Sequence, residues 1–321
     1  LALAESGELA FRRLDELKIG DYLAIQRGQQ TFGQETHLPP FEFTPRTNAL
    51  DGKLPAHLTE DLALFLGYLV SEGTLSFDNQ VTFCHTDPEI QADMAGLTES
   101  LFGLRLRRHM HRGQWNGKDF RIFGVKLRRF LLNLGLAQGR AASKSIPPSI
   151  LTAPKPIVTA FLRAYFEGDG SIYGPDGRVE IASASYELLS QLHILLLNYG
   201  AVGNLRAKRD SKYDRDYYYL TLIGENMSRF ADQIGFLSTI KRDKLKKYVA
   251  AQKGIRRNPN VDVLPYQNNR LRALRPQVKA AADTLRRFTR SDNRAPSYYS
   301  LRHILEEAQT ASHDPNYQIL E

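Results

Sequence analysis

The chain has 321 residues, of which 42% are hydrophobic and 24% charged, so it can bury a core and is not of disordered composition. Its one cysteine, Cys84, excludes a disulfide framework and a thiolate-rich metal site. No apolar run approaches the roughly 20 residues that span a bilayer, and no signal-peptide pattern is present, so we expect an intracellular protein without a membrane partner. The 43 Lys and Arg outnumber the 35 Asp and Glu, a net charge of +8 that favours nucleic acid as partner, although an ordinary basic enzyme can carry the same charge.

The chain begins with weak structural signals and then turns strongly helical. Residues 1–30 are expected to form short strands with a turn, the last of them over 17–25, and residues 31–57 a Pro- and Thr-rich linker. A helix is predicted from Leu58, with Thr59 as its N-cap, because apolar residues follow at helical spacing. A second helix of the same kind runs through Ile157 and Tyr165.

Each of these helices opens the same succession of elements, α-β-β-α-β-β-α, over residues 58–153 and again over 154–249. A two-copy repeat of this length predicts an α+β fold with pseudo-two-fold symmetry rather than a solenoid. Residues 250–321 are expected to form a small basic helical module. The expected elements of the two copies are strands near 81–84 and 179–182, helices near 88–102 and 185–199, strands at 104–109 and 204–209, and strands near 120–123 and 217–220; two helices follow near 270–288 and 297–310.

An acidic residue directly before glycine ends each repeat's first helix: Glu72 before Gly73, and Asp169 before Gly170. The C-terminal end of a helix is unfavourable for a carboxylate, so two such acids at equivalent positions indicate a function. Small residues near both helix ends would allow close packing, which would bring the two carboxylates together; they are Gly67 and Ser71 in the first helix and Ala164 and Gly168 in the second. All-oxygen ligands suit Mg²⁺, and a divalent ion beside a basic surface is typical of phosphodiester hydrolysis.

Two lysines lie at matching distances from these acids: Lys144 follows Glu72 by 72 residues, and Lys241 follows Asp169 by 72. An ammonium group near each metal site could stabilise developing charge. The alternative is a solvated surface lysine, and near Lys241 the cations Arg242 and Lys244 compete for the role.

The two helix ends resemble a known pair of motifs. Residues 65–73 read FLGYLVSEG and residues 162–170 read LRAYFEGDG, and both resemble the motifs of LAGLIDADG homing endonucleases. Residues 143–147, SKSIP, resemble the segment that carries the family's catalytic lysine, and 241–245, KRDKL, resemble its counterpart after the second repeat. The family more often has Asp where this chain has Glu72.

The resemblance implies a monomer whose four-stranded saddle sheets lie in the major groove of double-stranded DNA. It implies a site-specific double-strand break with 3′ overhangs, made with two or three shared Mg²⁺ ions, with Mn²⁺ as a substitute and Ca²⁺ not supporting cleavage. It also implies metal binding by the carboxylates of Glu72 and Asp169 and by the carbonyls of Ser71 and Gly168, with Lys144 and Lys241 as supporting catalytic residues.

The flanks indicate the intein-encoded branch of this family. Residues 14–24, LDELKIGDYLA, resemble part of an intein splicing domain, and residues 260–265, NVDVLP, resemble the region after the endonuclease insertion. The chain begins at Leu1, without the first-residue nucleophile of splicing, and ends without the terminal His-Asn, so as given it is not expected to splice.

Alternation places basic side chains on one face of the strands at 104–109 and 204–209. That face would meet DNA bases or phosphates, although an ordinary solvated sheet face looks the same. The candidate DNA-binding residues are Arg105, Arg107, His109, Arg206, Lys208, Tyr217 and Tyr219. A non-cleaving DNA-binding regulator on this scaffold, a fragment of a splicing intein and an RNA maturase remain alternatives to the endonuclease.

Overall fold

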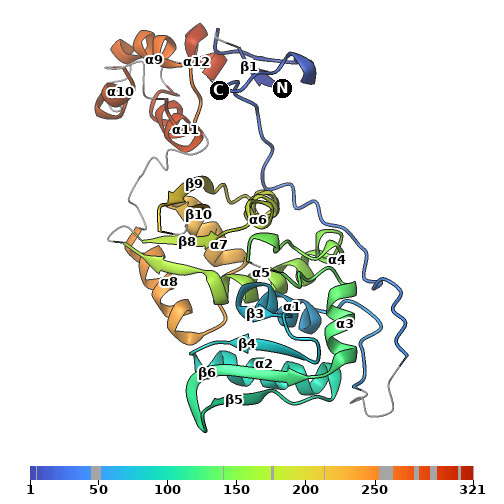
Figure 1. The fold of residues 1–321 in the computed structure, drawn as a ribbon. Coiled ribbons are helices and arrows are strands. Elements are labelled where there is room, and N and C mark those ends of the chain that lie inside the picture. Colours follow the sequence, from blue (N-terminus) through green and yellow to red (C-terminus); the bar gives the residue numbers. More distant parts are fainter. Residues whose placement is uncertain are drawn as a thin grey trace. The chain divides into compact units, whose positions relative to one another are not determined.

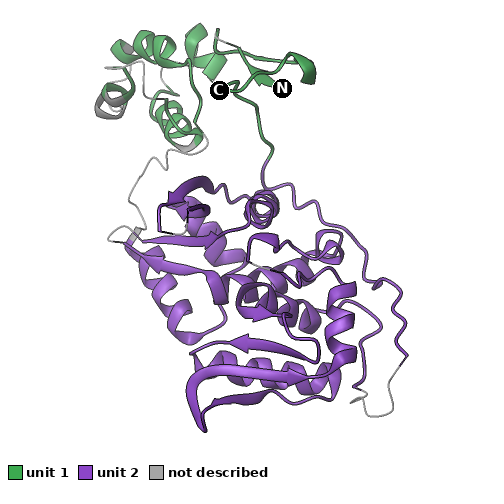
Figure 2. Ribbon diagram, viewed as in Figure 1, with its two compact units in different colours: residues 1–26, 254–321 green, residues 27–253 purple. Residues whose placement is uncertain are grey.

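The computed structural model describes residues 1–4, 6–44, 52–139, 141–174, 177–212, 214–252, 263–277, 282–289, 295–309 and 312–320. The chain divides into two compact units (Figure 2). One unit combines residues 1–26 with residues 254–321, and the other contains residues 27–253. Across the described ranges, no helix is both long enough and apolar enough to cross a bilayer.

The larger unit contains the predicted repeat, with the same order of elements in both copies (Figure 1). The first copy consists of α1 (Glu60–Glu72), β3 (Gly73–Thr74), β4 (Gln80–Cys84), α2 (Pro88–Phe102), β5 (Arg107–His111), β6 (Gln114–Phe123) and α3 (Val125–Asn133). The second consists of α5 (Lys155–Asp169), β7 (Ser171–Tyr173), β8 (Arg178–Ser183), α6 (Tyr186–Asn198), β9 (Asn204–Asp210), β10 (Arg215–Ile223) and α7 (Glu225–Gln233). Between the copies lie the turn Ala141–Ser143 and α4 (Pro148–Leu151), and α8 (Thr239–Gln252) follows the second copy.

Both copies build the same antiparallel sheet, with strand orders β3-β4-β6-β5 and β7-β8-β10-β9. One face of each sheet is apolar and buried, with Val81, Phe83 and Ile122 in the first sheet and Val179, Ile181 and Leu220 in the second. Helices cover these faces, while the opposite faces are partly exposed. The predicted α+β fold with two equivalent halves is therefore confirmed.

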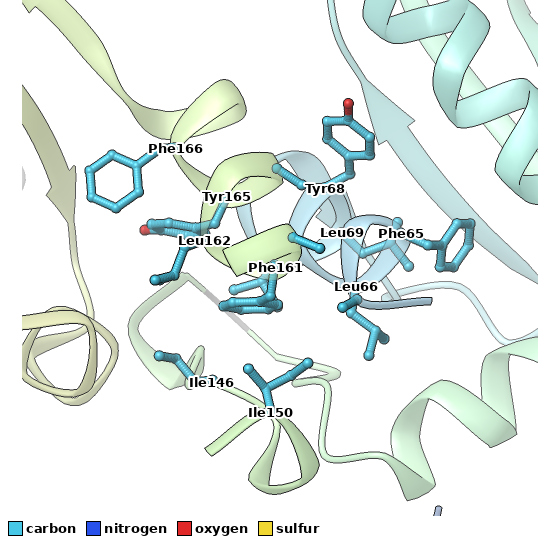
Figure 3. Close-up of a cluster of buried hydrophobic side chains, with 14 of the residues drawn as sticks. Phe65, Leu66, Tyr68, Leu69, Ile146, Ile150, Phe161, Leu162, Tyr165 and Phe166 are labelled. Carbon is cyan, nitrogen blue, oxygen red and sulfur yellow. The ribbon is translucent and has the colours of Figure 1, made fainter. Parts of the chain in front are cut away.

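Helices α1 and α5 pack side by side at the centre of the larger unit (Figure 1). The Thr59 hydroxyl accepts a hydrogen bond from the Leu62 amide at 3.2 Å, which makes it the expected N-cap of α1. Close packing depends on Gly67, because a methyl group there would lie 2.5 Å from the Phe161 carbonyl oxygen. Around the helix pair, Figure 3 shows the buried side chains Phe65, Leu66, Tyr68, Leu69, Phe161, Leu162, Tyr165 and Phe166, with Ile146 and Ile150 below them.

Two expected elements differ from those observed in the larger unit. The strand expected at 104–109 is β5, which starts only at Arg107 and has a register shift between Arg108 and Met110. Leu104 is buried in the core directly after α2. Because of this, residues 104–106 do not join the sheet. The linker expected at 31–57 packs Phe32, Leu38 and Phe41 against the core.

The smaller unit has its own apolar core, formed by α9 (Asn268–Leu274), α10 (Ala282–Thr289), α11 (Tyr298–Glu307) and α12 (Pro315–Leu320). The helix expected at 270–288 was wrong in its length: it is divided at Pro276, which cannot donate a helical hydrogen bond. At the N-terminus, β1 (Ala2–Leu3) pairs with β2 (Leu9–Ala10). The strand expected near residues 17–25 is reduced to a single bridge between Leu23 and Ala2.

Candidate active site at the ends of the central helices

The two acidic residues occupy the last positions of the two central helices, Glu72 in α1 and Asp169 in α5. In both cases the chain leaves the helix at once and enters a strand. The following residue has no room for a side chain: a methyl group on Gly73 would lie 2.6 Å from the Leu69 carbonyl oxygen, and one on Gly170 would lie 2.3 Å from that of Phe166. The glycine after each acid is therefore required by the helix-to-strand turn.

Close contact between the helices brings the two ends together, as the small residues predicted. A methyl group on Gly168 would lie 2.2 Å from Ser71 Oγ and 2.9 Å from Glu72 Cγ. The Ser71 hydroxyl turns back onto its own helix and donates to the carbonyls of Gly67 and Tyr68, each at 3.1 Å. Glu72 thus lies directly against the helix turn that carries Asp169.

Each predicted lysine reaches the C-terminal end of the first helix in its own repeat. Lys144 Nζ donates to the carbonyls of Val70 at 2.7 Å and Ser71 at 3.0 Å. Lys241 Nζ donates to the carbonyls of Glu167 and of Gly170, the latter at 2.9 Å. The two ammonium groups therefore neutralise the negative ends of the two helix dipoles, where the carboxylates also lie.

The electrostatics show that these groups share one environment. Burial raises the pKa of Asp169 to about 7; the Lys144 ammonium and the Tyr165 hydroxyl oppose this rise, and the Glu72 carboxylate adds to it. Burial lowers the pKa of Lys144, and the charge of Asp169 partly restores it. Burial likewise lowers the pKa of Lys241, against the charges of Glu167, Glu72 and Asp169.

The donor atoms at this site suit a hard divalent cation. Within the ranges given above, no group of three or more His, Cys, Asp and Glu side chains is placed to hold a metal by itself. Mg²⁺ is commonly bound through one or two carboxylates together with water and substrate phosphate, so Glu72 and Asp169 fit that ion. The Ser71 carbonyl, an expected metal ligand, accepts a hydrogen bond from the Lys144 ammonium at 3.0 Å.

The open face of the second sheet carries the residues expected there. Tyr217 pairs with Lys208 and Tyr219 with Arg206 across β10 and β9, which places all four on the same face. Arg206 also lies over the Tyr219 ring, 5.3 Å from its centroid.

The open face of the first sheet carries Arg107 opposite Arg121, and Arg121 Nη2 lies 2.8 Å from Nε2 of His109. Arg105 is exposed but precedes β5, so strand alternation does not place it on this face.

Sequence reasoning missed three polar residues near the site. Glu180 on β8 accepts hydrogen bonds from Thr221 Oγ1 at 2.7 Å and from Arg206 Nη2 at 3.0 Å, so it restrains a candidate DNA contact. The alternation of side chains along β8 could have revealed Glu180. Arg121 could have been found in the same way on β6. Glu167 is fully buried in α5. It could have been found by aligning the two motifs, because it is acidic where the first motif has Val70.

Comparison with known proteins supports the assignment of the second repeat. Residues 156–235 match the family model of the LAGLIDADG-like domain. The match covers the helix that ends in Asp169, from its second residue, and all four strands of the second sheet.

Two curated relatives have different names. The chain is 28% identical over 306 residues to the replication factor C small subunit of Methanocaldococcus jannaschii, covering 94% of this chain and 14% of that protein. It is also 28% identical over 289 residues to the probable translation initiation factor IF-2 of Thermococcus kodakarensis, covering 84% of this chain and 23% of that protein. The chain thus spans less than a quarter of the length of either relative. Among solved structures, I-DmoI in complex with DNA and Ca is similar with a TM-score of 0.44 and 15% identity, over 59% of this chain and 97% of that one.

Proposed function

We propose that the chain is a site-specific DNA endonuclease of the LAGLIDADG homing type, which makes a double-strand break with a divalent metal ion, Mg²⁺ or Mn²⁺. The observation that carries the proposal is the meeting of Glu72 and Asp169 at the ends of two closely packed, equivalent helices, with one partly buried lysine at each helix end. A protein that only binds DNA has no need for carboxylates that would face phosphates. One chain supplies both halves, so we expect it to act as a monomer.

In this proposal the two carboxylates hold the ion, together with the Gly168 carbonyl, and each half acts on one DNA strand. The ion, when bound, polarises the scissile phosphate and lowers the pKa of water. Lys144 and Lys241 place positive charge beside the position of the phosphate and stabilise the charge that develops there. Their bonds to helix carbonyls hold both ammonium groups in position before DNA arrives, which reduces the cost of ordering them.

The two open sheet faces form the DNA-binding surface in this proposal. Arg107, His109 and Arg121 act from the first sheet, and Arg206, Lys208, Tyr217 and Tyr219 act from the second. Arg and Lys in such positions contact phosphates and guanine edges, and tyrosine adds polar contacts. We also retain the exposed Arg105, as a phosphate contact beside the first sheet.

We further propose that the chain is an intein-encoded element. Similar sequences occur as small parts of proteins with unrelated names, a replication factor and an initiation factor, which is expected of an intervening element rather than of a domain that serves the host protein. The union of residues 1–26 with 254–321 in one unit supports the same proposal, because the two flanks that resemble a splicing domain belong together.

The test is incubation of the purified chain with a randomised-site DNA library in Mg²⁺ and, separately, in Ca²⁺, followed by sequencing of the cut ends. We expect breaks at one long site in Mg²⁺ and none in Ca²⁺. The Asp169→Asn variant should bind the same site without cutting it. Enrichment of a bound sequence without breaks in either ion would refute cleavage and favour the DNA-binding regulator.

A further inference from the structure

The carboxylate of Glu167 is fully buried in α5, two residues before Asp169, and has no role in the mechanism above. The aligned motifs place Val70 of α1 at the equivalent position, where the side chain is apolar and buried. A buried carboxylate strongly destabilises a fold unless hydrogen-bond donors surround it. The second repeat therefore contains a costly group that the first repeat lacks, and its partners indicate its use.

Among the described residues, the hydrogen-bond donors to the Glu167 carboxylate come from the chain just before α8. Oε2 accepts from the amides of Leu237 at 2.7 Å and Ser238 at 3.0 Å, and Oε1 accepts from the Ser238 hydroxyl at 2.7 Å. Ser238 is itself buried, and α8 begins at the next residue, Thr239. Glu167 thus binds the N-terminal end of α8 from a different helix, where free amides and the helix dipole favour an anion.

This attachment fixes the position of Lys241, which lies in the first turn of α8. The Lys241 amide lies 3.4 Å from Ser238 Oγ, and the Lys241 ammonium lies 3.8 Å from Glu167 Oε1. The same ammonium donates to the main-chain carbonyls of Glu167 and Gly170. Glu167 therefore contacts this segment twice. Its carboxylate accepts hydrogen bonds from the residues at the start of α8, and its main-chain carbonyl accepts one from the Lys241 ammonium.

The first repeat holds its lysine by other means. Lys144 lies after a short turn rather than in a helix, and its carbonyl accepts the Ser185 hydroxyl at 2.6 Å. Close by, the Ile146 amide donates to Gln191 Oε1 at 2.8 Å. Ser185 and Gln191 belong to the start and middle of α6, in the second repeat. The two lysines are thus positioned independently, by Glu167 on one side and by α6 on the other.

We propose that Glu167 is a positioning residue for Lys241, and that the two half-sites are therefore separable: loss of Glu167 impairs the half-site of Lys241 and spares that of Lys144. The proposal rests on the proposed function only for its consequence in DNA cleavage. Whether Glu167 positions Lys241 can be measured without DNA.

The first test measures the reactivity of the two lysine amines in the whole protein. The wild type, Glu167→Gln and Ser185→Ala are treated briefly with N-hydroxysuccinimide acetate, and acetylation at Lys144 and Lys241 is quantified by peptide mass spectrometry. We expect Glu167→Gln to raise acetylation of Lys241 several-fold with Lys144 unchanged, and Ser185→Ala to do the reverse. Ser238→Ala removes only one bond to the carboxylate, and should give a smaller increase at Lys241 if Glu167→Gln does not fold.

The second test follows the two DNA strands separately on the duplex identified by the library experiment. Glu167→Gln should cut one strand about tenfold to a hundredfold more slowly and the other at the wild-type rate, so that nicked duplex accumulates. A purely structural role would slow both strands together.

Equal changes at both lysines, or no change at Lys241 in a folded Glu167→Gln protein, would overturn the proposal. If the wild type cuts no DNA, the proposed nuclease function fails, while the acetylation ratio still decides whether Glu167 positions Lys241.

Discussion

Replacing Asp169 with Asn tests whether the carboxylate is held in an environment that disfavours its charge. The pKa of Asp169 is raised from 3.8 to about 7, chiefly by burial. Since the pKa in the folded state exceeds that in the unfolded state, the stability linked to this group is fully present below about pH 4 and is lost as the pH rises through about 7. Asn has nearly the same shape and no charge, so without metal the variant should become increasingly more stable than the wild type as the pH rises.

The magnitude follows from the two pKa values. They give the variant an advantage of about 2 kcal/mol at pH 5 and about 4 kcal/mol at pH 8, an increase of roughly 2 to 3 kcal/mol before solvent screening. Because Asp169 is partly exposed, we expect an increase of about 1 to 2 kcal/mol, or roughly 3 to 8 °C in Tm.

The assay is thermal unfolding of wild type and variant from pH 5 to pH 8 with a chelator present. Asp232→Asn, at an exposed position of α7, controls for the change in net charge and should shift Tm by less than about 2 °C. Adding Mg²⁺ at pH 8 should raise the Tm of the wild type more than that of Asp169→Asn, because binding to the folded state stabilises it. A gap between the two proteins that stays constant from pH 5 to pH 8 would refute the reasoning.

Three further predictions concern packing, catalysis and DNA binding. Gly168→Ala should destabilise the protein by about 2 to 4 kcal/mol in denaturant unfolding, because its methyl group would lie 2.2 Å from an atom of the facing helix. The control is Gly96→Ala, at an exposed helical position with no atom within 4 Å, which should be neutral or stabilising by up to about 1 kcal/mol. Similar costs at both sites would contradict the close approach of the two helices. Lys144→Met should slow cleavage about a hundredfold while the Kd for DNA stays within a few-fold, and equal losses in both would show a binding role instead. The double variant Arg107→Ala with Lys208→Ala, one residue from each open face, should reduce the slope of log K against log salt by about two, and an unchanged slope would remove these faces from the DNA interface.

The parts of the site that could be predicted are those fixed by neighbouring residues in the sequence. The order of the repeat, the N-cap Thr59 and the Glu-Gly and Asp-Gly helix ends follow from apolar periodicity and from the turn that leaves each helix. The small residues Gly67 and Gly168 indicated close packing, and that packing is observed. The positions of the lysines followed from comparing the two copies.

The sequence could not reveal contacts between distant residues. Glu167 lies 71 residues from Ser238, and nothing in its own helix shows that three donors from another segment surround it. The prediction that residues 104–106 belong to the strand was wrong, because Leu104 is buried in the core. Side-chain alternation does not show whether a residue packs in the core or pairs in the sheet.

The sequence by itself determined the two equivalent halves and the acids that end their first helices, because those features arise from helical periodicity and local turns. Only the tertiary structure decided that both ends of the chain form one unit, where Gln267 Nε2 donates to the carbonyl of Gly7 at 3.0 Å, and that the two lysines are held by different devices. The physical reason is that the donors that satisfy a buried polar group come from wherever packing brings them, and packing depends on the whole chain.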